Sequence, residues 1–462
     1  MPFEIRIPRL VVAGTASGVG KTTFTVGLVY ALRSRGLKVA VFKCGPDYLD
    51  PTYHSRAAGV RSHNLDGWMM GREAVTATFV RAAAESDIAI IEGVMGLFDG
   101  ASATDESGST AEIAKWLDAP VLLLVDASGM ARSVAAVGRG FAEFDPELQV
   151  SALIANRVGS KGHLELLREA SARPPVIGGL PNEASAAFPE RHLGLRTAEE
   201  LAGVDALFSR WGALVNEWCE VDKIISIAAK APPLPGAIPM TATARRTSRC
   251  TIGIAYDEAF HFYYEDNLAR LESAGARLIR FSPIHDTRLP EVDGLYLGGG
   301  YPETYAAELQ RNVAMREQIA EFAARGGIVY AECGGLMYLC RELQTLDART
   351  YRMCDVVPAR TIMCERLQAL GYVEGRTLHN SIFGPGLGFR GHQFRYSRIE
   401  SLSSKVAPAF AIRRTRNGAE LEEGFSLNNV IASYVHVHWA SNPNLAEAMA
   451  GACVRARATT NK

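Results

Sequence analysis

The chain has 462 residues, and its 49 lysine and arginine residues nearly balance 50 aspartate and glutamate residues, for a net charge of −1. This balance argues against a protein that binds nucleic acid or an anionic membrane by bulk charge. A hydrophobic content of 48% with 21% charged residues excludes a disordered chain. No run approaches the roughly 20 apolar residues of a membrane span, and the N-terminus lacks the layout of a signal peptide. The eight cysteines show no metal-type spacing, so we expect reduced thiols and a cytoplasmic enzyme.

Short apolar runs rich in valine and isoleucine alternate with helix-like segments in the first half of the chain. Strands that are apolar on both faces and separated by helices indicate a parallel sheet covered on both sides. We therefore predict an α/β domain over 1–228. Its predicted strands are 9–14, 38–43, 87–91, 120–125 and 151–155, and its predicted helices include 21–35, 70–85 and 109–117.

A Pro-, Ala- and Thr-rich stretch at 229–250 lacks apolar periodicity and is typical of a linker. After it the alternation of apolar runs and helix-like segments restarts with TIGIAYD at 251–257. We predict a second α/β domain over 251–448, followed by a C-terminal tail at 449–462. The chain is thus expected to hold two α/β domains.

A glycine-rich motif at 14–23, GTASGVGKTT, lies directly between a predicted strand and a predicted helix. In a phosphate-binding loop, backbone N–H groups point at phosphate oxygens, a lysine reaches the outer phosphates, and a threonine can bind Mg²⁺. The strict pattern has glycine where Thr15 stands here, and the alternative is a simple strand-to-helix turn with an exposed lysine. The predicted ATP-binding residues are Gly18, Gly20, Lys21, Thr22 and Thr23.

Acidic residues follow the next two predicted strands. KCGPDYLDPTYH at 43–54 contains Asp47 and Asp50, and IIEGVMGLFDG at 90–100 contains Glu92. Ligands of open α/β sheets bind at the carboxyl ends of the strands, and a nucleotide-bound Mg²⁺ requires carboxylate oxygens there. Each carboxylate alone could be a loop residue or helix cap, but together they favour an ATP–Mg²⁺ site.

A cysteine in YAECGGLMYL at 330–339 stands where a predicted strand enters a helix. At such a turn the helix N-terminus can lower the thiol pKa and present a nucleophile, although Cys333 could equally be a small buried residue. Backbone N–H groups at Gly299, Gly300 and Gly334 could form an oxyanion hole.

Two histidines in ASYVHVHWASNP at 432–443, His436 and His438, lie on one side of a predicted strand. Either could be a structural core residue, but with the glycine-flanked Cys333 they favour a Cys–His amidotransferase site.

The chain carries KCGPDYLDPTYH, EGVMGLFDG, LGGGYPE, ECGGLMYL, GHQFRYS and SYVHVHWASNP in this order. With these motifs it resembles the cobyrinic acid a,c-diamide synthase family, the glutamine-dependent amidases of corrin biosynthesis, over essentially its whole length. The resemblance implies a dethiobiotin-synthetase-like P-loop domain followed by a class I glutamine amidotransferase domain. It also implies ATP-dependent amidation of two carboxylates of cobyrinic acid, or of a related tetrapyrrole such as hydrogenobyrinic acid, with ammonia from L-glutamine.

The resemblance assigns roles to matching positions. Cys333 would take the glutamyl group as a thioester, and His436 would be its base. His438 stands where other class I amidotransferases have a glutamate, so a complete Cys–His–Glu triad is not expected. In the first domain the resemblance assigns ATP and Mg²⁺ to Lys21, Thr22, Asp47 and Glu92, and places Asp50 near the activated carboxylate.

One motif departs from the family pattern, because the common GHEFHYS reads GHQFRYS here, with Gln393 and Arg395. A guanidinium in place of an imidazole would suit a carboxylate-rich substrate edge, or it could be neutral drift.

Three other functions compete with this hypothesis. Nickel-sirohydrochlorin a,c-diamide synthase shares the mechanism, and cobyric acid synthase amidates other carboxylates. A regulatory P-loop ATPase with an inactive amidotransferase domain is the alternative from another class. The sequence leaves open whether the chain forms a homodimer.

Overall fold

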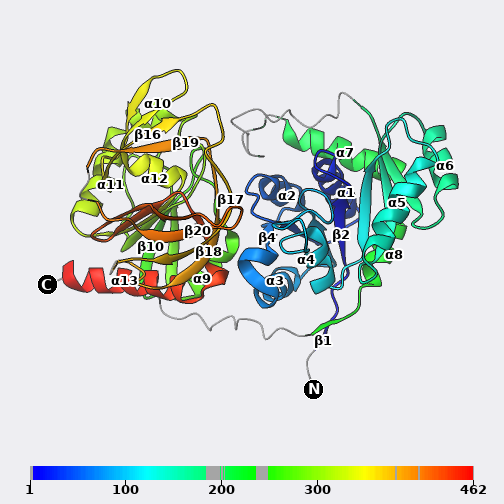
Figure 1. Ribbon diagram of the computed structural model, residues 1–462, viewed down its shortest axis with the longest axis horizontal. Coiled ribbons are helices and arrows are strands. Elements are labelled where there is room, and N and C mark those ends of the chain that lie inside the picture. The colour runs from blue at the N-terminus through cyan, green and yellow to red at the C-terminus, as the bar shows by residue number, and fades with distance from the viewer. Residues whose placement is uncertain are drawn as a thin grey trace. The chain divides into compact units, whose positions relative to one another are not determined.

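The computed structural model describes residues 4–183, 198, 201, 203–235, 248–379, 382–403 and 406–460. The chain divides into two compact units, Met1–Thr241 and Ala242–Lys462. They are called unit 1 and unit 2 below (Figure 1). Of the predicted linker at 229–250, residues 236–247 lie outside the described residues. The predicted domain boundaries stay predictions.

Unit 1 is built on a parallel sheet of seven strands in the order β4-β3-β5-β2-β6-β7-β8. All five predicted strands are present in it, so the predicted parallel α/β sheet is confirmed. A short antiparallel pair joins β1 (Glu4–Ile5) to β9 (Leu234–Pro235). The strands of the sheet are β2 (Arg9–Gly14), β3 (Val39–Cys44), β4 (His63–Leu65), β5 (Ile88–Glu92), β6 (Val121–Asp126), β7 (Val150–Val158) and β8 (Val176–Pro181).

Helices cover this sheet (Figure 1). Leu10, Val11 and Val12 on the central strand β2 are all fully buried, as expected for a strand with helices on both faces. The three predicted helices are confirmed as α1, α3 and α4. The helices of unit 1 are α1 (Lys21–Ser34), α2 (Asp50–Ala58), α3 (Gly67–Ala83), α4 (Thr110–Trp116), α5 (Ser133–Phe144), α6 (Lys161–Ala170), α7 (Val204–Trp218) and α8 (Val221–Ala229).

Unit 2 has a central sheet of six strands in the order β11-β10-β12-β13-β23-β22, parallel except for β22. Its strands are β10 (Cys250–Ala255), β11 (Ala276–Phe281), β12 (Gly294–Leu297), β13 (Ile328–Glu332), β22 (Phe425–Leu427) and β23 (Val430–Ser433). Its helices are α9 (Glu265–Ser273), α10 (Ala306–Arg311), α11 (Val313–Ala324), α12 (Gly334–Leu339) and α13 (Asn444–Thr460).

Two further sheets of unit 2 were not predicted from the sequence. Many of their strands alternate between buried and exposed residues, so they lack the continuous apolar runs that mark a central strand. One sheet contains β14 (Cys340–Gln344), β15 (Thr350–Arg352), β16 (Val357–Met363) and β19 (Ser397–Ser401). The other contains β17 (Ala369–Thr377), β18 (Gly388–Arg395), β20 (Phe410–Arg414), β21 (Glu420–Glu423) and β24 (His436–His438).

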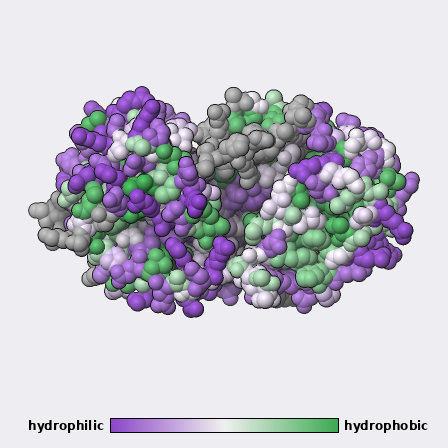
Figure 2. All heavy atoms as spheres, turned by 45° about the horizontal axis from the view of Figure 1, so that its top comes forward, coloured by the Kyte–Doolittle hydropathy of each residue, from purple (hydrophilic) through white to green (hydrophobic). Residues whose placement is uncertain are grey.

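The visible surface intersperses hydrophilic and hydrophobic residues (Figure 2). Large apolar side chains that are exposed, such as Phe144 in unit 1 and Leu370 in unit 2, are normal on a folded protein. In the described part of the chain, no helix combines the length and apolar character that crossing a membrane requires.

Candidate active sites

The predicted phosphate loop lies between the last residue of β2, Gly14, and the first residue of α1, Lys21. Gly18 and Gly20 have φ angles of 76° and 96°, a left-handed conformation that favours glycine. The side-chain amide of Asn156 donates to Val19 O at 2.8 Å, and a Cβ on Gly20 would lie 2.2 Å from its nitrogen. Asn156, which the sequence gave no reason to single out, therefore helps to hold the loop.

The Lys21 side chain is buried beneath this loop, with 7% of the residue exposed. Its ammonium donates to Ala16 O at 3.1 Å and also to Met95 O. Burial and the nearby Lys43 ammonium lower its pKa to about 8. A phosphate oxygen would be a stronger partner for this ammonium than the two neutral carbonyls, because a charge-assisted hydrogen bond is the stronger kind.

Thr22, Asp50 and Glu92 meet at the carboxyl ends of the strands. The Thr22 hydroxyl donates to Glu92 Oε1 at 2.8 Å and to Asp50 Oδ2 at 3.3 Å. The structure adds Lys43, whose ammonium lies 2.7 Å from both Asp50 Oδ2 and Glu92 Oε1. His54 Nε2 lies 2.6 Å from Glu92 Oε2. Lys43 and His54 are the first and last residues of KCGPDYLDPTYH, and this position was the signal that could have identified them.

The charged groups of this cluster shift one another's pKa values. Burial opposes ionisation of Glu92, but Lys43 and His54 outweigh it and hold the Glu92 pKa below its usual value. Burial and the adjacent Asp50 raise the pKa of Asp47 to about 6. Asp47 Oδ1 accepts from the backbone N–H groups of Leu49, at 2.8 Å, and Asp50, at 3.0 Å. Of the three predicted carboxylates, Asp50 and Glu92 therefore contact Thr22, whereas Asp47 contacts the start of α2.

This set of oxygen atoms suits Mg²⁺ by its chemistry, since Mg²⁺ prefers carboxylate and hydroxyl ligands. Across the described residues, no group of three or more His, Cys, Asp and Glu side chains is arranged to hold a metal by itself. A nucleotide-bound Mg²⁺ needs only one or two protein ligands, because waters and phosphates complete its shell. Thr22 and Glu92 therefore fit such an ion.

Replacing Lys43 by methionine should lower the free energy of unfolding of unit 1 by about 3–5 kcal/mol, because two buried carboxylates would lose their cation. The folded-state pKa of Glu92 lies below its reference value of 4.5, so its stabilising contribution exists above that pH and fades as pH falls. The difference in the free energy of unfolding between the variant and the wild type should therefore become smaller at acidic pH. Urea unfolding at several pH values measures it.

Lys115→Met is the matched control. Lys115 pairs with Glu106, Asp145 and Glu147, but two of these partners are exposed. Partly exposed pairs contribute about 0–1 kcal/mol, so this variant should lose little stability. An equal loss of unfolding free energy in the two variants would contradict the prediction that removing a cation from a buried cluster destabilises the protein more than removing a partly exposed one.

In unit 2, Cys333 lies at the turn between β13 and α12, as predicted. Its φ of 47° and ψ of −100° are strained for a residue with a side chain, and its N–H donates to Ser433 O at 2.7 Å. Nucleophiles on strand-to-helix turns often have such a backbone because it presents the side chain at the end of the sheet.

The glycines predicted to form the oxyanion hole lie against one another. A Cβ on Gly334 would lie 3.0 Å from the nitrogen of Gly300, and one on Gly299 would lie 2.4 Å from Cε1 of His436. Gly300 has a φ of 153°, and a Cβ there would lie 2.0 Å from Ala259 O. The structure thus brings Gly299, Gly300 and Gly334 together, with His436 against Gly299 and with Cys333 directly before Gly334 in the chain.

The pKa of the Cys333 thiol is raised rather than lowered, contrary to the prediction from the adjacent helix N-terminus. Burial, with a contribution from Glu303, raises the pKa of Cys333 to about 12 against the opposing effect of Arg395. The helix after Cys333 has only six residues, and the desolvation of a thiolate outweighs it. Cys333 is therefore a thiol at rest and needs a base to take its proton.

His436, the base predicted for this thiol, is neutral and only weakly basic at rest. It is only 2% exposed, and burial lowers its pKa to about 3. Its ring stacks on His392 of β18 with centroids 4.9 Å apart. His438 has different surroundings, because its Nδ1 accepts from Ala440 N at 3.3 Å and its ring lies 4.5 Å from that of Tyr264.

Gln393 and Arg395 both lie on β18 in unit 2. The Arg395 guanidinium lies over the ring of Tyr434 at 4.3 Å and donates to Ser397 O at 2.8 Å. Gln393 is 1% exposed, and within the described residues its side-chain amide makes no hydrogen bond. Of the two residues of the GHQFRYS motif that differ from the family pattern, Gln393 therefore lies in the interior of unit 2, and Arg395 contacts residues of that interior.

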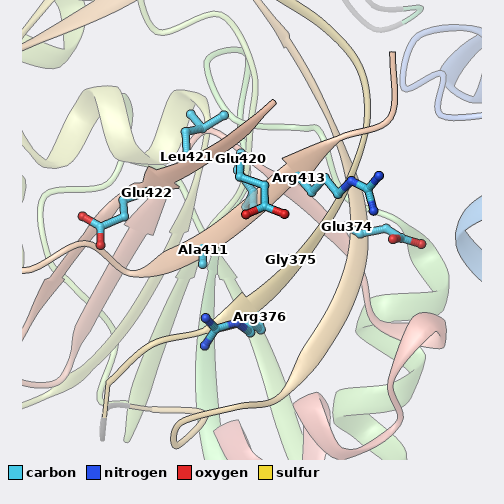
Figure 3. Close-up of a pocket in the computed structure, with 9 residues that line it drawn as sticks. Glu374, Gly375, Arg376, Ala411, Arg413, Glu420, Leu421 and Glu422 are labelled. Atoms are coloured by element: carbon cyan, nitrogen blue, oxygen red, sulfur yellow. The ribbon is translucent and has the colours of Figure 1, made fainter. Parts of the chain in front are cut away.

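A hollow of about 570 Å³ lies on β17, β20 and β21 of unit 2 (Figure 3). Side chains of both charges line it, among them Glu374, Arg376, Arg413 and Glu420. None of the predicted site residues lines it, and we assign it no function.

Models of two protein families match the chain. Residues 10–195 match the CobQ/CobB/MinD/ParA nucleotide binding domain, and residues 251–444 match the CobB/CobQ-like glutamine amidotransferase domain. Together the two matches include most of units 1 and 2 and all the predicted site residues.

Curated proteins match over nearly the whole chain. A cobyrinate a,c-diamide synthase of Leptospira interrogans is 51% identical over 455 residues, which cover 98% of this chain and 100% of that protein. One of Syntrophotalea carbinolica is 48% identical over 96% of this chain and 98% of its own length. A solved glutamine amidotransferase is 17% identical with a TM-score of 0.33 and covers 44% of this chain and 98% of that structure's chain, too distant to add to these matches.

Proposed function

The chain belongs to the cobyrinate a,c-diamide synthase family, a family of glutamine-dependent ligases of corrin biosynthesis, and we propose how its two sites share the reaction. The substrate is cobyrinic acid or hydrogenobyrinic acid, and the a and c side-chain carboxylates become amides. The observation that carries the proposal is that one chain holds both a phosphate loop beside Thr22, Asp50 and Glu92 and a Cys333–His436 site beside the glycines.

Unit 1 activates the carboxylate. A carboxylate is a poor acyl donor because its charge is delocalised and oxide is a poor leaving group, so phosphorylation by ATP must come first. Backbone N–H groups at Gly18 and Gly20 and the Lys21 ammonium hold the phosphates, with Thr23 in the same turn of α1. Mg²⁺, when bound, would supply positive charge that offsets the charge of the phosphates.

In our proposal Thr22 and Glu92 would hold this Mg²⁺, with Asp47, the third residue predicted for it, at the start of α2. Asp50 lies within hydrogen-bonding distance of the Thr22 hydroxyl, which supports a place near the activated carboxylate. The acyl phosphate then takes up ammonia and releases phosphate.

Unit 2 supplies the ammonia. His436 takes the thiol proton of Cys333, and the sulfur attacks the side-chain carbonyl carbon of glutamine. Backbone N–H groups at Gly299, Gly300 and Gly334 stabilise the resulting oxyanion. The imidazolium returns the proton to the leaving nitrogen, ammonia departs, and water releases glutamate from the thioester.

We also propose that the protein works in the cytoplasm, where its eight cysteines, all free in the structure, stay reduced. A homodimer stays a prediction, which light scattering of the purified protein would test.

The test of this function is amidation of cobyrinic acid by the purified protein, followed by mass spectrometry. With ATP, Mg²⁺ and glutamine we expect two successive products, each with one carboxylate converted to an amide. Amidation of nickel-sirohydrochlorin instead would change the substrate and keep the mechanism. No amidation of either compound, despite ATP binding, would favour the regulatory ATPase.

A further inference from the structure

A buried carboxylate lies beside the proposed base. Glu332, the last residue of β13, is 1% exposed, and its Oε2 lies 4.0 Å from Nδ1 of His436. It directly precedes Cys333 in the sequence. No motif gives Glu332 a role, and the resemblance places the acid of the triad at position 438, where this chain has a histidine.

Three donors fix the Glu332 carboxylate. Oε1 accepts from the Tyr330 hydroxyl at 2.7 Å and from Val437 N at 3.0 Å, and Oε2 accepts from the Tyr296 hydroxyl at 2.9 Å. A carboxylate oxygen has two lone pairs, so Oε2 retains capacity for one more donor on the side of His436. Val437 lies next to His436 on β24, so the same contact also fixes the backbone beside the imidazole.

The nitrogen that faces Glu332 is the one that a triad requires. In a nucleophile–histidine–acid triad, one ring nitrogen takes the proton of the nucleophile, and the acid contacts the other. Here Nδ1 faces Glu332, while Cε1 lies against Gly299, the glycine that neighbours Gly334. This orientation leaves Nε2 as the atom that receives the proton.

We propose that Glu332 is the positioning residue of the glutaminase site, taking the place of the triad glutamate that His438 replaces. The inference rests on the proposed function. When His436 takes the proton, the S–H bond of Cys333 breaks, an N–H bond forms at Nε2, and the ring carries a proton on each nitrogen. The Glu332 carboxylate stabilises this imidazolium through Nδ1–H. Hydrogen bonds of catalytic groups are often long without substrate and shorten in the complex, which accommodates the 4.0 Å separation.

The protonation of Glu332 is governed first by its burial. Burial raises the pKa of Glu332 to about 7, against the hydrogen bonds from Tyr330, Val437 and Tyr296. The carboxylate therefore ionises near neutral pH. The titratable groups that face it are the two tyrosines on β12 and β13 and His436 on β24, and His392 on β18 stacks on the imidazole.

Glu332→Gln tests the proposal in the full-length protein, because it keeps the shape of the side chain and removes its charge. We expect kcat for glutamine hydrolysis to fall by about 10- to 100-fold with little change in KM for glutamine. Amidation driven by free ammonia should keep the wild-type rate. The wild-type rate should rise with pH as Glu332 ionises around pH 7, and the variant should lose this rise.

Two variants separate charge from structure. Glu423→Gln removes another buried carboxylate of unit 2, which accepts from the Ser433 hydroxyl and from Tyr434 N, and should keep the pH-dependent rise. Tyr330→Phe keeps the Glu332 carboxylate but removes one donor to it. The pKa of Glu332 should then increase and move the rise to higher pH, a readout that remains if Glu332→Gln fails to fold.

The outcomes are distinct. An unchanged kcat and pH profile in Glu332→Gln, beside an active wild type, would overturn the inference. Parallel losses in the Glu332 and Glu423 variants, including the ammonia-driven reaction, would make Glu332 a structural residue and overturn it as well. A wild type without glutamine-dependent amidation would instead contradict the proposed function.

Discussion

Replacing Cys333 by alanine should abolish glutamine-dependent amidation and leave amidation by free ammonia at the wild-type rate. The rate with glutamine should fall by about 10⁴- to 10⁶-fold, because no thioester can form. The other residues of the glutaminase site act only together with the nucleophile, so they cannot compensate for its loss. In our proposal the acyl phosphate forms in unit 1, whose described contacts do not depend on Cys333. Parallel assays with glutamine and with ammonium chloride, read by mass spectrometry, measure the two rates.

Cys340→Ala is the matched control for this prediction. Cys340 lies just beyond α12, is fully buried, and accepts from the Thr361 hydroxyl at 3.5 Å. Burial raises the pKa of its thiol to about 12, as it does for Cys333, so the two cysteines differ in place rather than in acidity. This variant should lose some stability and keep its glutaminase activity. If both variants lost ammonia-driven amidation too, damage to the fold would explain the result.

Sequence patterns predicted the central sheets well because continuous apolar runs mark strands that are covered on both faces. The strands β2, β3, β5, β6 and β7 begin and end close to their predicted bounds, with β7 longer at its C-terminal end. Most strands of the two additional sheets in unit 2 have one exposed face or mixed burial, and their pairing depends on residues far apart in the chain. Sequence periodicity alone could not assign them, except for the fully buried β24, which lies in the predicted strand that carries His436 and His438.

The candidate sites show the same limit. Motifs identified Lys21, Glu92, Cys333 and His436, because phosphate loops and cysteine turns have local signatures. The role that we propose for Glu332 was not predicted because it depends on His436, about a hundred residues away in the chain and brought near through β13, β23 and β24. The resting state of the Cys333 thiol was also beyond prediction, since its largest cause is burial, which local sequence does not reveal.

Replacing Lys21 by alanine should abolish amidation with either nitrogen source. We expect a loss of about 10²- to 10³-fold in the ammonia-driven rate, because one charge on the transferring phosphoryl group would no longer be neutralised. In the wild type, the pKa of Lys21 near 8 means that the free protein loses this ammonium as pH rises above 8, so KM for ATP should increase there. Steady-state assays with ammonia, from pH 7 to 9, measure both effects.

Lys38→Ala, which replaces an exposed lysine directly before β3, is the control and should leave the rates of amidation with glutamine and with ammonia unchanged. The pattern across variants then locates each half-reaction. Cys333→Ala stops only the use of glutamine, because ammonia bypasses the thiol, whereas Lys21→Ala stops both, because every amide requires an activated carboxylate. A Lys21→Ala protein that amidates with ammonia at the wild-type rate would mean that ATP is used somewhere other than the loop after β2.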